Sequence, residues 1–562
     1  MTKNNAEQNP EADVVVVGSG AAASAAAVAA FSQGAEVVML EKSPVPGGTT
    51  MKSGGQPWIP NNFALRKQGV KDIKEDCLRF MARGCFPQIY SPESDYLGLP
   101  QYAYDLLESY YDNAAPAIDF LMKIGACEFV QAQPVLPDYV DHVPENKVLR
   151  GRLVAPTTVK SGPGVGSDLI RQLHGWINKK KIPLLTGHRV TRILQDGHGR
   201  VTGVAATNAD GSEVMVNAKQ AVVFGSGGYT HNKELILNFQ KGPTFGGCAV
   251  ITNTGDFIFM AQAVGAQLGN MNSAWNAEIP LEQALEFSSA PDDIWQPTGD
   301  SMILVNKYGL RVVDEKRNYN DRTKVHFYWD PVEQEYPNEL LCMIYDQRTL
   351  DLYAGGLEPY PLPRPGNSEN YVITGKTWAE LVRNIRKRVD KLAPRIGNWR
   401  LANDFGRHLK STLARYNRFA EEGVDRDFHR GEYPYDIEWH KAFFSVPAKG
   451  TKWKLDQSNI TMHSFADKGP YYCILVAAGT LDTNGGPKIN KFAQVLDTEE
   501  RPIPGLYGAG NCIAAPMPNY IAGGATIGNA LTFGYVAGMQ AARENKLQRR
   551  EPVKESAYAG AR

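Results

Sequence analysis

The chain has 562 residues, 43% of them hydrophobic and 21% charged, which is typical of a folded protein of about two domains and excludes a disordered one. Lysine plus arginine and aspartate plus glutamate each total 60, so charge gives no reason to expect a nucleic-acid partner. The seven cysteines are scattered and form no C-x-x-C pair, which argues against a disulfide framework, a zinc site or a c-type haem.

The first fifty residues predict a dinucleotide-binding unit. An apolar strand at 12–17 leads into the turn Gly18-Ser19-Gly20 and then into an alanine-rich helix that ends near Phe31. A second strand at 36–40 ends at Glu41, about 20 residues past the turn, where a carboxylate can accept ribose hydroxyls. An ordinary glycine turn is the alternative. The unit predicts cofactor contacts from Gly18, Gly20, Ala21, Ala22, Glu41 and Lys42.

A second glycine-rich loop follows the acid and favours FAD over NAD. Two more Gly-Gly pairs lie within about fifteen residues of Glu41, flanked by threonine and serine. Glycine permits close backbone approach, and the hydroxyls can donate to a pyrophosphate or a flavin edge. A nicotinamide enzyme has no need of this loop, whereas two tight surface turns would be the structural alternative. The expected contacts are Gly47, Gly48, Thr49, Thr50, Ser53, Gly54 and Gly55.

Later segments return to the same pattern. A strand runs into a glycine turn at 221–228, and another does so at 505–511. The alternation at 187–194, followed by 201–204, predicts a hairpin, and Thr254-Gly255-Asp256 opens a helix. A dinucleotide fold assembled from both ends of the chain implies a large insertion between them. Further expected contacts are Val190, Gly225, Ser226, Gly227, Asp256, Gly510 and Asn511.

We therefore expect an α/β fold with a Rossmann-like FAD-binding domain, the FAD/NAD(P)-binding fold, built from residues 1–281 and 470–562. An α+β substrate or catalytic domain is expected at 282–469, where aromatic and charged residues become more frequent. Within it, helices are predicted at 377–392, opened by the capping pair Thr377 and Glu380, and at 404–422. A charged tail follows Glu544.

The segment from Asn519 to Gly528 pairs a phenol with a glycine-opened helix start. Unpaired N–H groups of a first helical turn attract a negative oxygen, and the Tyr520 hydroxyl lies four residues before Gly524. Together they could hold a substrate carbonyl as an oxyanion site for an enolate. The cofactor contacts expected at the helix start are Ala525, Thr526 and Ile527.

Over nearly its whole length, the chain resembles the fumarate reductase/succinate dehydrogenase flavoprotein superfamily, FAD enzymes with a catalytic domain inserted into a Rossmann-like one. The resemblance rests on 18–20, 47–50, 254–256, 505–511 and 525–534. Fumarate and succinate enzymes place an arginine just before the final helix, but 514–525 contains neither arginine nor histidine. The 3-ketosteroid Δ1-dehydrogenases place a tyrosine there and a glycine four residues later, as in this chain.

That branch carries two more tyrosines. One follows Pro-Asp and matches Tyr139, and the other lies in a stretch after a strand of the inserted domain and matches Tyr319. The resemblance implies that Tyr520 and Gly524 hold a ketone oxygen and that Tyr319 removes the α proton. Flavin N5 accepts a hydride from the β carbon, and Tyr139 hydrogen-bonds Tyr319 to ease formation of its phenolate. The expected reaction is FAD-dependent α,β-dehydrogenation of a cyclic ketone to the conjugated enone.

The chain departs from the pattern of the 3-ketosteroid Δ1-dehydrogenases at two places, and these leave the substrate open between a 3-oxosteroid and a smaller ring ketone such as cyclohexanone. The loop 521–523 lacks the usual prolines, and 86–102 looks like extra sequence. The alternatives are a reductase acting on an enone or fumarate-type substrate in the opposite direction, and a non-catalytic flavin-binding protein. No histidine accompanies the flavin-contact motifs, so FAD is expected to be non-covalent. We expect a cytoplasmic location and no transmembrane segment, because no apolar stretch approaches about 20 residues.

Overall fold

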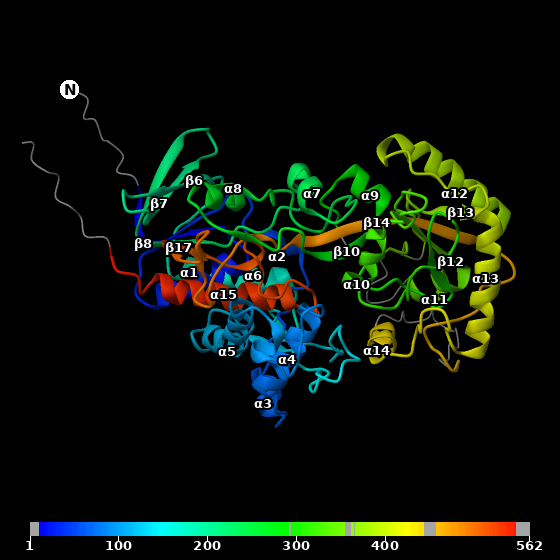
Figure 1. Cartoon of the computed structure of the whole chain (residues 1–562), viewed down its shortest axis with the longest axis horizontal. Coiled ribbons are helices and arrows are strands. Elements are labelled where there is room, and N and C mark those ends of the chain that lie inside the picture. The colour runs from blue at the N-terminus through cyan, green and yellow to red at the C-terminus, as the bar shows by residue number, and fades with distance from the viewer. Residues whose placement is uncertain (1–9, 292–293, 355–360, 365, 443–456, 547–562) are drawn as a thin grey trace, which may run out of the picture.

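The computed structural model describes residues 10–291, 294–354, 361–364, 366–442 and 457–546, and these residues form two bodies, each built around a β-sheet (Figure 1). Nearly all of the expected charged tail after Glu544 lies outside the described residues. Among the described residues, no helix combines the length and apolar character needed to cross a membrane.

Strands from both ends of the chain make up the first sheet. Its order is β16-β17-β8-β1-β2-β5, and the hairpin of β6 and β7 is attached at β8. The N-terminal β1 pairs in parallel with β2 and β8, and the C-terminal β17 pairs in parallel with β8, so the α/β fold assembled from both chain ends is confirmed. The strands are β1 (Glu11–Val17), β2 (Val37–Leu40), β5 (Leu184–Leu185), β6 (Arg189–Gln195), β7 (Val201–Thr207), β8 (Glu213–Phe224), β16 (Gln494–Leu496) and β17 (Pro502–Gly508).

Helices cover this sheet and bury its strands. Every residue of β1 after Glu11 is buried, as expected for a central strand with both faces covered. Helices α1 (Ala21–Ser32) and α15 (Ala525–Ala541) pack together against the sheet. Helices α4 (Lys74–Cys85) and α5 (Gln101–Lys123) lie below α15 in the view of Figure 1. The expected extra sequence at 86–102 connects α4 to α5 and includes the first two residues of α5.

The remaining elements of the first body surround these. They are α2 (Gly48–Lys52), α3 (Phe63–Lys67), α4 (Lys74–Cys85), α5 (Gln101–Lys123), β3 (Phe129–Gln131), β4 (Val154–Pro156), α6 (Gly166–Lys179), α7 (Lys233–Phe239), α8 (Asp256–Ala263), β9 (Leu268–Gly269) and β15 (Gly486–Pro487).

An antiparallel sheet forms the second body. Its order is β10-β14-β12-β11, with β13 also paired to β14. Helices α12 and α13 pack on it through a core that includes Leu381, Ile385 and Leu409. The elements are β10 (Ala274–Pro280), α9 (Leu281–Glu286), β11 (Met302–Val305), α10 (Tyr319–Thr323), β12 (Leu340–Asp346), α11 (Gln347–Tyr353), β13 (Ile373–Gly375), α12 (Trp378–Leu392), α13 (Phe405–Glu422), α14 (Pro434–Ala442) and β14 (Tyr471–Thr483).

This second sheet extends beyond the span 282–469 that the sequence suggested for the insertion. Both β10 and β14 lie outside that span, yet they pair with each other, and β14 pairs with β12. The strand β14 has 13 residues and runs from the second body back to the first, as the long arrow in Figure 1 shows. The C-terminal end of this strand therefore reaches the first body, where Asp482 accepts a hydrogen bond from the Gly228 N–H at 2.9 Å.

Local predictions can be compared with the structure directly. The hairpin of β6 and β7 forms as expected. The Thr377 hydroxyl accepts from the Glu380 N–H at 3.2 Å, but the Glu380 carboxylate accepts from the Lys376 N–H instead of completing the capping box. The second glycine-rich segment is not an open loop, because residues 48–52 form the short helix α2.

Candidate active site

A cavity of about 430 Å³ runs from the glycine turn after β1 to the three candidate tyrosines. Both Tyr520 and Gly524 line it, as do Tyr139 and Tyr319. Among the expected cofactor contacts, Gly47 and Ala525 lie beside lining residues and do not line the cavity themselves. The others do line it, and they are Gly18, Gly20, Ala21, Ala22, Glu41, Lys42, Gly48, Thr49, Thr50, Ser53, Gly54, Gly55, Val190, Gly225, Ser226, Gly227, Asp256, Gly510, Asn511, Thr526 and Ile527.

The glycines at one end form a cradle that suits a dinucleotide. A Cβ atom on Gly20 would meet nothing closer than Thr50 Oγ1 at 3.4 Å, and one on Gly48 nothing closer than 3.8 Å. Packing of the protein therefore does not demand glycine at either position, although both line the cavity, and only at Gly48 does the left-handed backbone, with φ of 52°, itself favour glycine. A side chain there would instead take up space in the cavity, so the residues present fit a closely approaching pyrophosphate.

The carboxylate of Glu41 fixes the geometry of this end. It directly follows β2 and is 8% exposed. It accepts hydrogen bonds from the Ser19 hydroxyl at 2.6 Å and from the Ser43 N–H at 2.7 Å. Ser19 in turn accepts from the Gly47 N–H at 2.8 Å, so Gly47 contributes by joining the two glycine segments. The carboxylate keeps capacity to accept from a ribose, because two oxygens offer about four lone-pair sites.

Two other expected contacts, Lys42 and Asp256, are paired with each other. The Lys42 ammonium lies 2.9 Å from Asp256 and donates to the Thr254 hydroxyl at 2.8 Å, and Arg189 lies 2.9 Å from the same carboxylate. Burial alone would raise the pKa of Asp256, but the hydrogen bond from Arg189 and the charge of Lys42 outweigh it and lower the pKa. Both residues of the pair line the cavity, as does Val190.

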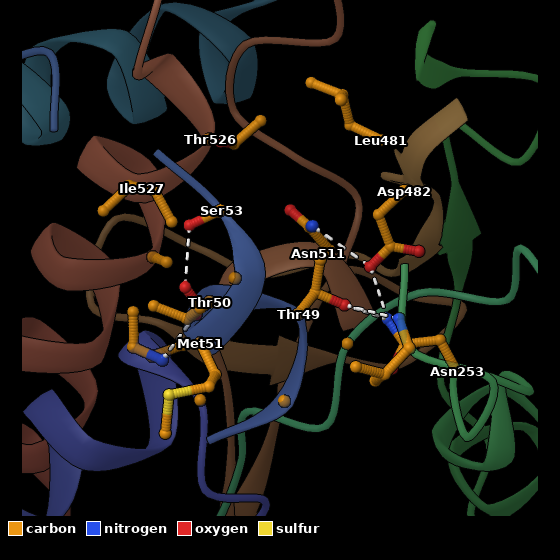
Figure 2. A pocket seen from close by; sticks show the side chains of 18 of the residues that line it. Thr49, Thr50, Met51, Ser53, Asn253, Leu481, Asp482, Asn511, Thr526 and Ile527 are labelled. Carbon is orange, nitrogen blue, oxygen red and sulfur yellow. Dashed lines mark hydrogen bonds between the residues drawn. The ribbon is translucent and has the colours of Figure 1, made fainter. Parts of the chain in front are cut away.

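A buried aspartate that sequence reasoning missed joins several cavity segments (Figure 2). Asp482, at the end of β14, accepts from the Asn253 amide at 2.8 Å, the Asn511 amide at 3.2 Å and the Gly228 N–H at 2.9 Å. The Asn253 amide also donates to the Thr49 hydroxyl at 3.3 Å. Burial raises the pKa of Asp482, although the hydrogen bonds from Gly228 and Asn511 oppose the rise. No local pattern could have revealed this residue, since its partners are distant in the chain.

At the other end of the cavity, Tyr139 donates its hydroxyl to the Tyr319 hydroxyl at 2.8 Å. This hydrogen bond, which the family resemblance implied, is present in the structure. Tyr139 lies on a loop whose N–H groups at 139 and 140 both donate to the Ile521 carbonyl, at 3.0 and 3.2 Å. Tyr319 begins α10, and the Asn318 side chain caps that helix by accepting from the Asp321 N–H at 2.9 Å.

The expected oxyanion donors, Tyr520 and Gly524, are bonded to each other in this structure. The Gly524 N–H donates to the Tyr520 hydroxyl oxygen at 3.2 Å. Gly524 has φ of 80° as the N-terminal cap of α15, and a Cβ atom there would meet the Gln56 carbonyl oxygen at 2.1 Å, so only glycine fits. A ketone oxygen can reach both donors only if their hydrogen bond opens.

Aromatic rings enclose the tyrosines, which are 2 to 3% exposed. The ring centroids of Tyr139, Tyr319 and Tyr520 lie 5.3 to 5.7 Å from one another. Three tryptophans that sequence reasoning missed also line the cavity, each packed on a tyrosine: Trp439 on Tyr139 at 5.7 Å, Trp295 on Tyr319 at 6.1 Å and Trp275 on Tyr520 at 5.1 Å. This end of the cavity is apolar apart from a few hydroxyl and amide groups.

Two potential nucleophiles were also missed. Both His188 and Cys248 line the cavity. His188 lies near Glu41, since its N–H donates to the Glu41 carbonyl at 2.9 Å, and one ring nitrogen lies 2.8 Å from the Thr186 carbonyl. This places His188 at the end where the ribose is expected.

Comparison with known proteins agrees with this geometry. A family model described as an FAD binding domain matches residues 13–527. The 3-oxosteroid 1-dehydrogenase of Mycolicibacterium smegmatis is 27% identical, covering 95% of this chain and 97% of that protein. The 4-oxocyclohexanecarboxylate 2-dehydrogenase of Sinomonas cyclohexanicum is 28% identical, and the match covers 94% of this chain and 92% of that protein. The crystal structure of a 3-ketosteroid delta1-dehydrogenase from Sterolibacterium denitrificans covers 95% of this chain and all of that one, with a TM-score of 0.78 and 23% identity, which supports the fold.

Proposed function

The chain belongs to the FAD binding domain family and is an FAD-dependent oxidoreductase, and from this premise we propose that it desaturates a cyclic ketone to the conjugated enone. The observation that carries the proposal is the Tyr139–Tyr319 hydroxyl pair, which meets Tyr520 and Gly524 in the cavity that also holds the dinucleotide cradle. The two relatives are named for a 3-oxosteroid and for 4-oxocyclohexanecarboxylate, and both are cyclic ketones.

The glycine cradle, Glu41 and the hydroxyls of Thr49 and Thr50 would hold the cofactor. Bound FAD supplies the acceptor for the hydride that leaves the β carbon. The chain's own residues then have two tasks: to hold the ketone oxygen and to remove the α proton. Each task falls to one pair of groups at the tyrosine end of the cavity.

Tyr520 and Gly524 hold the ketone oxygen in this mechanism. Binding replaces the 3.2 Å hydrogen bond between these two groups with two hydrogen bonds to the substrate oxygen. As the α proton leaves, that oxygen gains negative charge, and hydrogen bonds to a charged acceptor are about twice as strong as neutral ones. The exchange therefore favours the enolate-like transition state over the ground state.

Tyr319 removes the α proton, and Tyr139 makes it a better base. A tyrosine has an unperturbed pKa near 10, so a phenolate needs support at neutral pH. The Tyr139 hydroxyl donates to the Tyr319 oxygen, and a donor to the charged form favours that form. Trp439 and Trp295 pack on the two buried tyrosine rings, and a hydrogen bond in such apolar surroundings is stronger than one in water.

Anaerobic mixing of the oxidised holoenzyme with saturated ring ketones tests the proposal. The panel contains cyclohexanone, 4-oxocyclohexanecarboxylate and a 3-oxosteroid. Any true substrate should cause a loss of the visible absorbance of the oxidised flavin. Bleaching by at least one ketone, with enone as product, supports dehydrogenation. If none bleaches the flavin, while a chemically reduced enzyme is reoxidised by an enone, the reaction runs in the reductive direction instead.

We also propose that FAD is held without a covalent bond, because the segment 47–55 contains no histidine or cysteine. Acid precipitation should then leave the yellow colour in the supernatant. A yellow pellet would contradict this, and mass spectrometry of its peptides would identify the attachment residue, with His188 and Cys248 as the lining candidates.

A further inference from the structure

We propose that Arg317 is the positioning residue that holds Tyr139 at hydrogen-bonding distance from Tyr319. The catalytic meaning of that pair rests on the proposed function, but the geometry does not. Arg317 lies two residues before Tyr319 and belongs to the same segment of the second body. Its guanidinium reaches the loop that carries Tyr139, so one side chain connects the two candidate tyrosines through their backbones.

The contacts of Arg317 are directional. One terminal nitrogen donates to the Tyr139 backbone carbonyl at 3.1 Å and to the Asp141 carboxylate at 2.9 Å. The other terminal nitrogen donates to the Asp436 carboxylate at 2.9 Å. The guanidinium thus binds three acceptors on two other segments, the loop 139–141 and α14. A lysine cannot match this arrangement, because an ammonium on a flexible chain lacks the planar fork.

The two carboxylates are themselves held in place. Both side chains are fully buried. Asp141 also accepts from the Tyr435 N–H at 2.6 Å, and Asp436 accepts from the Gly431 N–H at 3.1 Å. Burial alone would lower the pKa of Arg317, but Asp436 and Asp141 outweigh it and raise the pKa, so the charge of the guanidinium is secure.

Aromatic packing continues the same connection to Tyr139. The guanidinium lies 4.9 Å from the Tyr433 ring and 5.4 Å from the Tyr435 ring. The Tyr435 ring in turn packs edge-on against Tyr139 at 5.4 Å. At its own backbone, the Arg317 carbonyl accepts from the Arg322 guanidinium at 2.6 Å, which ties the residue to α10. The segment that carries Tyr319 is therefore braced directly against the segment that carries Tyr139.

Loss of the guanidinium would release this brace. The two buried carboxylates of Asp141 and Asp436 would lose the cation that they share, and the loop 139–141 would move to separate or hydrate them. The Tyr139 hydroxyl would then lose its fixed distance to Tyr319. Because Arg317 acts through Tyr139, its removal should not lower the rate of flavin reduction any further in a chain that already lacks the Tyr139 hydroxyl.

A double-mutant cycle tests this directly in the holoenzyme. We expect Arg317→Met and Tyr139→Phe each to slow ketone-driven flavin reduction by about 10- to 100-fold, the value of one hydrogen bond to a charged group. The ketone dissociation constant should change by less than about threefold, since substrate contacts remain. The double variant should be no slower than either single variant. If the rate loss in the double variant instead equals the product of the two single losses, the proposal is overturned.

Two further variants guard against trivial explanations. Arg317→Lys keeps the charge and is expected to fold; it should show a partial loss and the same non-additivity with Tyr139→Phe. The matched control is Arg150→Met, which removes another arginine that binds α14, through Glu438 at 2.6 Å, without contacting Tyr139 or Tyr319. It should leave the rate unchanged, and an equal loss in this control would overturn the proposal.

A crystal structure of Arg317→Met, or of Arg317→Lys if the first variant does not fold, gives a readout independent of activity. The distance between the two tyrosine oxygens should exceed 3.5 Å instead of the present 2.8 Å, whereas FAD affinity should be unchanged. A retained distance would overturn the proposal. If no ketone bleaches the wild-type flavin, the proposed function fails, and this distance alone decides the positioning role.

Discussion

The two ends of the cavity are built in different ways. The cofactor end consists of short contiguous segments after strands of one sheet, and much of its surface is backbone of glycines such as Gly20 and Gly48. The tyrosine end consists of side chains from distant segments that meet across the two bodies, as in the contact of Tyr139 with Tyr319, 180 residues apart. Binding at the first end therefore depends on local backbone shape, while chemistry at the second depends on how the bodies are held together.

This difference predicts which changes separate affinity from rate. A substitution at the cofactor end should weaken FAD binding and leave the rate of the loaded enzyme intact. A substitution of a tyrosine should do the opposite. A variant that changed both together would mean that the two ends are not independent, and the predictions below probe this point in order of expected effect.

The largest effect is expected for Tyr319→Phe. Loss of the proposed general base should slow ketone dehydrogenation by about 10²- to 10⁴-fold, with FAD affinity and thermal stability unchanged. Exchange of the ketone's α protons with deuterated water, followed by NMR without net oxidation, should fall in parallel.

Tyr435→Phe is the matched control for this prediction. Tyr435 is fully buried and packs on Tyr139, but its hydroxyl has no hydrogen-bond partner among the described residues. Its removal should leave the rate within about threefold, because no bond is lost. If Tyr319→Phe oxidises ketones at the normal rate while the control does too, Tyr319 is not the base.

The next largest effect is expected for Tyr520→Phe. Removal of one oxyanion donor should lower turnover by about 10²- to 10³-fold. Tyr507→Phe serves as the control, since that hydroxyl donates to Glu544 at 2.8 Å and does not line the cavity. Normal turnover in Tyr520→Phe would mean that the ketone oxygen binds elsewhere.

The same contrast between the two ends explains how much the sequence could predict. The strand, turn and helix of the first unit were placed within one residue, since β1, α1 and β2 begin and end almost where the apolar pattern changes. Local hydrophobic periodicity and turn chemistry determine such elements. The resemblance to 3-ketosteroid Δ1-dehydrogenase-like flavoproteins is likewise confirmed by the family match and the relatives.

The tyrosine end could be predicted only through that resemblance. With 25 tyrosines in the chain, nothing local distinguishes Tyr139 from the others. Arg317, Trp295 and Asp482 were missed, because their partners lie on segments that only the folded chain brings together. The extent of the second sheet was missed for the same reason, since β14 pairs with strands more than one hundred residues away.

The smallest effect is expected for Glu41→Gln, which should change the affinity for FAD. The amide keeps the shape of the side chain and can still accept from the Ser19 hydroxyl, but hydrogen bonds to its neutral oxygen are weaker than those to a carboxylate. We expect the FAD dissociation constant to rise by about tenfold, which corresponds to about 1.4 kcal/mol. The rate of ketone-driven flavin reduction at saturating FAD should be unchanged.

Glu36→Gln is the control for this prediction. The Glu36 side chain is 73% exposed and lies just before the same strand, and among the charged groups of the described chain it contacts only Lys219, at 3.4 Å. If Glu41→Gln instead slowed the loaded enzyme, the cofactor end would also set the geometry of the tyrosines, and the separation of the two ends would be wrong.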